Sequence, residues 1–83
     1  MKKRTDILER QVGEEHMLYD AAGRRVHVLN ETARFVWALC DGRNGVEEML
    51  AEAAKEYEAP ANQLRADIEA CLAELKELGL LTD

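Results

Sequence analysis

Serine is absent from this 83-residue sequence, and histidine and cysteine occur only twice each. Without serine, neither His16 nor His27 can activate a serine nucleophile, and no cysteine lies near either histidine in the sequence to take its place. Both histidines fall on predicted strands, where we expect them to be surface residues. Since an enzyme needs converging titratable groups in a pocket, the sequence predicts no catalytic activity.

The two cysteines, Cys40 and Cys71, are far apart in the sequence and form no C-x-x-C pair. With no histidines clustered beside them, they give no support for a metal site or a redox centre. A glycine-rich phosphate loop is also missing, because Gly42 and Gly45 only mark the two ends of one turn between helices. The sequence therefore predicts no cofactor and no metal, and it favours both cysteines as small apolar core residues.

Long apolar runs are missing too, and no segment approaches the roughly 20 apolar residues that span a bilayer. The basic start, Met1-Lys2-Lys3-Arg4, is not followed by the apolar stretch of a signal peptide. These absences predict a cytoplasmic protein without a membrane partner. Two cysteines outside any disulfide pattern suit that compartment.

Positive charge is scarce: 11 Lys and Arg residues stand against 17 Asp and Glu residues, for a net charge of −6. Affinity for nucleic acid comes mainly from Lys and Arg contacts with phosphates, so this balance predicts no nucleic-acid partner. A composition of 47% hydrophobic and 34% charged residues is that of a folded chain. At this size folding buries only about 60% of the unfolded surface, which leaves room for one thin core.

The first part of the chain, up to Asn30, has the pattern of short strands. We predict strands over Ile7–Val12, His16–Asp20 and Arg24–Leu29, with a turn at residues 21–23. In the third strand Val26 and Val28 point to one face, and Arg25, His27 and Leu29 point to the other. A hairpin alone is marginally stable in water, so these strands must pack on the helices that follow.

After Asn30 the apolar residues repeat with the period of helices, which we predict over about residues 31–41, 45–58 and 61–78. Asn30 is a good N-cap for the first helix, and Asp41-Gly42 ends it. Either residue of Asn44-Gly45 can cap the second helix, Pro60 opens the third, and Gly79 ends it. The expected buried positions are Val46, Met49, Leu50, Ala53 and Tyr57 on the second helix, and Leu64, Ile68, Leu72, Leu75 and Leu78 on the third.

Residues 1–83 are thus predicted to form a single α+β domain with a winged helix-turn-helix-like fold. Its small N-terminal antiparallel sheet of three short strands precedes three helices. A winged-helix DNA-binding regulator is an alternative, because the third helix carries Asn62, Gln63 and Arg65 near its start. The four carboxylates that follow between Asp67 and Glu77 would lie beside phosphates and oppose such binding.

Several short motifs occur in one order along the last two thirds of the chain. They are Leu29-Asn30-Glu31-Thr32-Ala33, Trp37-Ala38-Leu39-Cys40-Asp41-Gly42, Val46-Glu47-Glu48-Met49, Tyr57, Asp67-Ile68 and the run from Leu75 to Leu80. In this order and spacing the chain resembles the PqqD family, small domains that bind the leaders of ribosomally made, modified peptides. Gly45 replaces the family's usual threonine cap, and Gly79-Leu80 replaces the Gly-Trp of pyrroloquinoline quinone chaperones. A recognition domain for another modified peptide therefore fits as well as one for that pathway.

The resemblance implies that a precursor leader peptide binds as an extra strand beside the third strand and against the third helix. The chain would then present it to a modifying enzyme, such as a radical S-adenosylmethionine enzyme, a peptidase or a cyclase. The residues expected to bind the peptide are Arg25, Val26, His27, Val28 and Leu29 on the strand, and Leu64, Arg65, Asp67 and Ile68 on the helix. A purely structural subunit of a larger enzyme is a further alternative.

Overall fold

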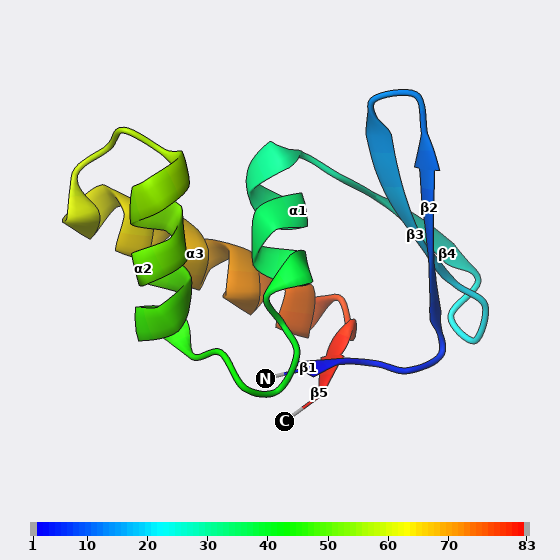
Figure 1. Ribbon diagram of the computed structural model, residues 1–83. Helices are drawn as coiled ribbons and strands as arrows, with labels where there is room; N and C mark the ends of the chain where they lie inside the picture. The colour runs from blue at the N-terminus through cyan, green and yellow to red at the C-terminus, as the bar shows by residue number, and fades with distance from the viewer. Residues whose placement is uncertain (1, 83) are drawn as a thin grey trace.

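The computed structural model describes residues 2–82 and shows a small sheet standing beside three helices (Figure 1). The elements in chain order are β1 (Lys2–Lys3), β2 (Ile7–Val12), β3 (Glu15–Asp20), β4 (Arg25–Leu29), α1 (Glu31–Ala38), α2 (Val46–Glu56), α3 (Ala61–Glu77) and β5 (Leu81–Thr82). The predicted α+β fold, with three N-terminal strands followed by three helices, is confirmed. None of the described helices is long and apolar enough to cross a membrane.

Strands β2, β3 and β4 form an antiparallel sheet in that order, so β3 is central and β4 is an edge. The register sets Leu18 opposite His27 and His16 opposite Leu29, on the face that points to the helices. Gly13 turns the chain between β2 and β3 with φ of +62°, a left-handed conformation that glycine adopts at no steric cost. The other face of the sheet is open and carries the exposed apolar residues Leu8, Val12, Tyr19, Val26 and Val28.

Two further strands join the ends of the described chain, and the sequence pattern did not predict them. β1 pairs antiparallel with β5, with Lys2 opposite Thr82 and Lys3 opposite Leu81. Figure 1 shows this pair beneath α1, with the first and last described residues, Lys2 and Thr82, paired. A two-residue strand is too short to show the alternation by which strands are recognised in a sequence.

The helices begin where the caps predict but end earlier. The Asn30 side chain accepts a hydrogen bond from the Ala33 N–H at 2.8 Å, which fixes the start of α1. The predicted end of this helix at residue 41 is wrong by three residues, because α1 stops at Ala38. There the Asp41 carboxylate accepts hydrogen bonds from the Arg43 and Asn44 N–H groups and holds the chain in a turn.

The ends of α2 and α3 follow the same local chemistry. The Gly45 N–H donates to the Glu48 carboxylate at 2.7 Å at the start of α2. α2 ends at Glu56 and α3 at Glu77, two residues and one residue short of the prediction. Beyond α3, Gly79 has φ of +76°, and the Leu80 N–H donates back to the Leu75 carbonyl.

One core joins the inner face of the sheet to all three helices. Its buried members are Leu18, Leu29, Val36, Trp37, Cys40, Met49, Ala53, Leu64, Ile68, Leu72, Leu75 and Leu80. Cys40 is completely buried, as predicted, whereas Cys71 is only half-buried. Leu78 is also only half-buried, because the last turn of α3 reaches the edge of this core.

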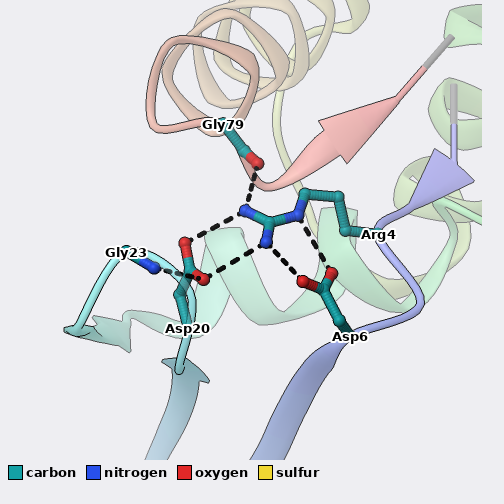
Figure 2. Close-up of polar contacts among 5 residues, drawn as sticks. All are labelled: Arg4, Asp6, Asp20, Gly23 and Gly79. Atoms are coloured by element: carbon teal, nitrogen blue, oxygen red, sulfur yellow. Dashed lines mark hydrogen bonds and ion pairs between the residues drawn. The ribbon is translucent and has the colours of Figure 1, made fainter.

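A single arginine ties the sheet to the end of α3 (Figure 2). The Arg4 guanidinium donates to both Asp6 and Asp20 and to the Gly79 carbonyl, with Asp20 at 3.0 and 3.2 Å. Asp20 also accepts the Gly23 N–H at 3.1 Å. This bond, together with Arg4, lowers the pKa of the Asp20 carboxyl. A side chain on Gly23 would place its Cβ 2.9 Å from the Asp20 carboxylate and would push that carboxylate away from its present position.

Candidate functional site

The edge of β4 that points away from β3 pairs with no strand in the described part of the chain. Such an edge presents a row of backbone N–H and C=O groups that another extended chain can pair with. Nearby β1 and β5 pair with each other and leave this edge open. The first requirement for strand addition is therefore present in the fold.

A groove runs between this edge and α3, which we call the β4–α3 groove. It is a hollow of about 370 Å³ lined by Val26, His27, Val28 and Leu29 of β4, by Asn30 and Ala33 at the start of α1, by Cys71, Glu74 and Leu75 of α3, and by Leu78 directly after α3. Leu29 and Leu75 are buried at its base. Glu74 and Asn30 are exposed polar residues of its lining. The groove thus combines a free strand edge, an apolar base and a polar rim.

Both histidines were predicted to lie on the surface, and this prediction is wrong. The alternation of the strands turns His16 and His27 toward the helices, where both are half-buried. The buried His27 Nε2 has no hydrogen-bond partner among the described residues. His16 Nε2 lies 3.4 Å from the Glu9 carboxylate on β2. Of the two, only His27 lines the β4–α3 groove.

The predicted peptide contacts on α3 lie outside the β4–α3 groove. Leu64, Asp67 and Ile68 line a second hollow of about 250 Å³ between the helices, which we call the helical hollow. Leu64 and Ile68 are also core residues. Arg65 forms a two-pronged ion pair with Glu47 of α2, which lowers the pKa of the Glu47 carboxyl. The strand half and the helix half of the predicted site are therefore in two neighbouring places.

The part of α3 that faces β4 is its C-terminal half, which the sequence did not single out. Cys71 and Glu74 on the helix and its C-cap Leu78 follow one another at the three- and four-residue spacing of neighbouring turns. Burial raises the pKa of the Cys71 thiol, so this cysteine is not an activated nucleophile. The described residues include no group of three or more His, Cys, Asp or Glu that could hold a metal ion.

A third hollow, of about 460 Å³, lies on the other side of α1 and is polar. It is lined by Lys3, Glu9, His16, Glu31, Arg34, Phe35, Trp37 and Ala38. Its charges partly satisfy one another, since Lys3 Nζ lies 3.7 Å from Glu9 and 5.2 Å from the centre of the Trp37 ring. It borders β2, the other edge strand of the sheet, through Glu9, but no residue of α3 lines it, so it is not a groove between a strand edge and that helix.

The family model described as "Coenzyme PQQ synthesis protein D (PqqD)" matches residues 15–81. The chain belongs to the PqqD family. The match includes β3, β4 and all three helices, and therefore both sides of the β4–α3 groove. The resemblance seen in the sequence motifs is confirmed, and β1 and β2 lie before the matched region. No curated protein matches this PqqD-family chain.

Two solved structures share the fold of this PqqD-family chain. One is "Lasso peptide synthetase B1 complexed with the leader peptide", with 23% identity, a TM-score of 0.86, and coverage of 99% of this chain and 96% of that one. The other is "TbiB1 in Complex with the TbiA(beta) Leader Peptide", with 20% identity, a TM-score of 0.85, and coverage of 98% and 94%. At these identities the likeness establishes the fold, which spans nearly the whole of each protein.

Proposed function

We propose that this PqqD-family chain binds the leader of a ribosomally synthesised precursor peptide as an added strand on β4. It then presents that peptide to a modifying enzyme and catalyses no step itself. The observation that carries the proposal is the free edge of β4, which faces α3 across a hollow of about 370 Å³. The two solved structures with this fold are both complexes with leader peptides.

Strand addition would use both kinds of group that line the groove. Backbone bonds to β4 supply affinity for any extended chain, whereas pockets for alternate side chains supply selectivity. Every second side chain of the peptide would point toward the apolar base formed by Leu29 and Leu75. The Glu74 carboxylate and the net charge of −6 favour a peptide that is not itself strongly acidic.

The position of the groove revises which residues of α3 we assign to the peptide. Arg25–Leu29 stay in the proposal as the pairing strand, with Cys71, Glu74 and Leu78 opposite them. Arg65 is left out because its guanidinium is already occupied by Glu47. Leu64, Asp67 and Ile68 border the separate helical hollow.

The partners that follow are a precursor leader peptide and the enzyme that modifies it. A radical S-adenosylmethionine enzyme, a peptidase and a cyclase all remain compatible with this role. We propose a cytoplasmic location, where ribosomal precursors are made, and no role for nucleic acid. The departures at Gly45 and Gly79-Leu80 keep the product open between pyrroloquinoline quinone and other modified peptides.

The test is a titration of the ¹⁵N-labelled full chain with candidate precursor peptides, followed by amide shifts. We expect the largest shifts in β4 and in residues 71–78, at the C-terminal end of α3 and its cap, with little change in α2. A duplex DNA titrated in parallel is the control for the regulator alternative. Failure of every precursor peptide to shift β4 would overturn the proposal.

A further inference from the structure

The hollow of about 460 Å³ on the other side of α1, which we call the polar hollow, has an unpaired arginine on its wall. Arg34 is half-buried, and its guanidinium forms no hydrogen bond or ion pair with any described residue. Glu31, one turn earlier on α1, is exposed and does not pair with it. A planar guanidinium binds a carboxylate through two parallel hydrogen bonds. Arg34 is therefore free to bind a carboxylate that enters the polar hollow.

Trp37 adds a hydrogen-bond donor that lacks an acceptor. Only 1% of this side chain is exposed, and it forms part of the wall of the polar hollow. Its Nε1–H has no hydrogen-bond partner among the described residues. An indole N–H can only donate, and a buried donor without an acceptor destabilises a structure. A ligand that brings oxygen acceptors into the polar hollow would supply what this group lacks.

The charges of the polar hollow favour a ligand with one negative charge over a ligand with two. Two cations and two carboxylates line it, so the lining is formally neutral when His16 is uncharged. The Glu9 carboxylate is already engaged, because it lies 3.7 Å from Lys3 Nζ and 3.4 Å from His16 Nε2. A dianionic phosphate would leave more negative charge uncompensated than a carboxylate would. The lining therefore fits the carboxylate of an aspartate or glutamate side chain.

The polar hollow also lies beside the second free edge of the sheet. Among the described strands β2 pairs only with β3, so its other edge is open. Glu9 of β2 lines the polar hollow, and its register partner Leu18 lies on the face that points to the helices. A chain added to this edge would point every second side chain to that same face. An extended segment held by backbone bonds to β2 can thus deliver a side chain to the polar hollow.

Helix α1 separates the polar hollow from the β4–α3 groove. Asn30 and Ala33 of this part of the chain line the groove, whereas Arg34 and Ala38 line the polar hollow. The two share no lining residue, and they lie at opposite edges of the three-stranded sheet. A peptide on β4 therefore leaves the β2 edge open to a second chain.

We propose that the β2 edge and the polar hollow bind an extended acidic segment of the modifying enzyme, with one of its carboxylates on Arg34. The choice of this enzyme rests on the proposed function, since it is the macromolecule that must bind while β4 is occupied. A carboxylate directly opposite Glu9 would be repelled by a like charge. The bound carboxylate therefore belongs to a residue of the segment that lies opposite Ile7 or Gln11, on the same face as Glu9.

The single tryptophan of the chain gives the first experiment a direct signal. A capped five-residue peptide, valine-threonine-glutamate-threonine-valine, is titrated into the ¹⁵N-labelled full chain, with its glutamine analogue as the control. We expect the glutamate peptide to shift the Trp37 indole N–H and the β2 amides. It should bind about tenfold more tightly than the glutamine peptide, because only a carboxylate forms the charged pair with Arg34. Equal affinities of the two peptides, or an unmoved Trp37 signal, would overturn the proposal.

Variants of Arg34 test whether this residue holds the carboxylate. Arg34→Gln removes the guanidinium, and Arg43→Gln removes the same charge from an exposed position outside the polar hollow. We expect Arg34→Gln to bind the two peptides equally, whereas Arg43→Gln keeps the wild-type difference. Arg34→Lys should keep part of it, because the charge remains without the planar fork. A full preference for glutamate in a folded Arg34→Gln chain would overturn the assignment of the carboxylate to Arg34.

The second experiment tests the occupant with a precursor peptide that shifts the β4 amides. The glutamate peptide should bind the chain equally well with and without this precursor. Modification of the precursor by its enzyme should slow by about tenfold in Arg34→Gln at limiting chain concentration, with the Kd of the precursor unchanged. An unchanged rate, or displacement of the glutamate peptide by the precursor, would overturn the enzyme as the occupant. Absence of β4 shifts with every precursor overturns the proposed function, and the glutamate peptide still tests the carboxylate site.

Discussion

The two cysteines illustrate how burial decides the role of a single residue. Cys40 is completely buried, its thiol donates to the Val36 carbonyl at 3.2 Å, and burial raises its pKa to about 11. Cys71 is half-buried in the wall of the β4–α3 groove. Neither is a thiolate at neutral pH, so neither is activated for chemistry. Their different exposure nevertheless makes Cys71 a natural reporter of the groove.

We expect N-ethylmaleimide to modify Cys71 slowly and to leave Cys40 unmodified in the folded chain. A saturating leader peptide should slow the reaction of Cys71 by at least about tenfold, because reactivity depends on access to the thiol. The measurement is mass spectrometry of the labelled chain over time. Cys71→Ala is the control and should still bind the peptide. Labelling of Cys71 at one rate with and without bound peptide would show that the peptide does not cover this wall.

Asp20 is the buried carboxylate that joins the sheet to Arg4. Its folded pKa lies below that of the unfolded chain, because the Gly23 N–H and Arg4 favour the charged form. A carboxyl with a lowered folded pKa stabilises the fold fully above its unfolded pKa, near 4. That contribution is lost as the pH falls through the lower folded value. The Arg4 cluster is thus one source of acid sensitivity in this fold.

We expect Asp20→Asn to lower the melting temperature at pH 7 by several degrees. The variant should also show a flatter decline of stability than the wild type as the pH falls below about 4, because it lacks the titrating group. Asp6→Asn removes the exposed partner of the same arginine and should have a smaller effect. Thermal unfolding by circular dichroism at several pH values measures both. Equal losses in the two variants would mean that burial of Asp20 adds nothing.

Among the elements, β4 allows the most specific test of strand addition. Its free edge offers backbone hydrogen-bonding groups only to alternate residues of an added strand. We expect N-methylation of a bound leader, one residue at a time, to weaken binding at every second position. Each lost bond should cost about 1 kcal/mol, or roughly fivefold in Kd. Competition binding with the methylated series measures this pattern. A peptide that binds as a helix would show sensitivity every three or four residues instead.

An element could be predicted when the interactions that form it lie close together in the sequence. Asn30, Gly45 and Pro60 act within one turn of the helices that they cap, so the helix starts were predicted correctly. The alternation within Arg25–Leu29 likewise gave the faces of β4. Strands β1 and β5 depend on a pairing between residues 80 positions apart, such as Lys2 and Thr82. No periodic pattern in either segment records that pairing.

The two sides of the candidate site also differ in how well they could be predicted. The strand side of the groove, Arg25–Leu29, came from the family resemblance, because strand order alone leaves two free edges, one on β2 and one on β4. The helix side of the groove could not be predicted, because α3 is 17 residues long and its buried apolar residues occur in both its N-terminal and its C-terminal half. Only the way in which α3 packs in the fold decides that Cys71 and Leu78, and not Arg65, line the groove beside β4.

At the scale of the whole molecule, the charge balance distinguishes the two roles proposed for this winged helix-turn-helix-like fold, which are peptide binding and DNA binding. We expect no sequence-specific binding to duplex DNA at physiological salt, because 17 acidic residues outnumber 11 basic ones. In addition, Arg65, near the start of α3, is held by Glu47. Fluorescence anisotropy with a random duplex pool measures this. Sub-micromolar, sequence-dependent binding would restore the regulator alternative.

The pairing of β1 with β5 brings the two ends of the fold to within one interstrand spacing, about 5 Å. A unit whose entry and exit points are this close can be inserted into a surface loop of a second protein without forcing that loop apart. The same closeness allows circular permutation, with a short linker joining the ends and a new opening at the exposed Gly13 turn. The β4–α3 groove lies away from the chain ends and from the Gly13 turn. Insertion or permutation at these points would therefore leave the proposed peptide-binding groove intact.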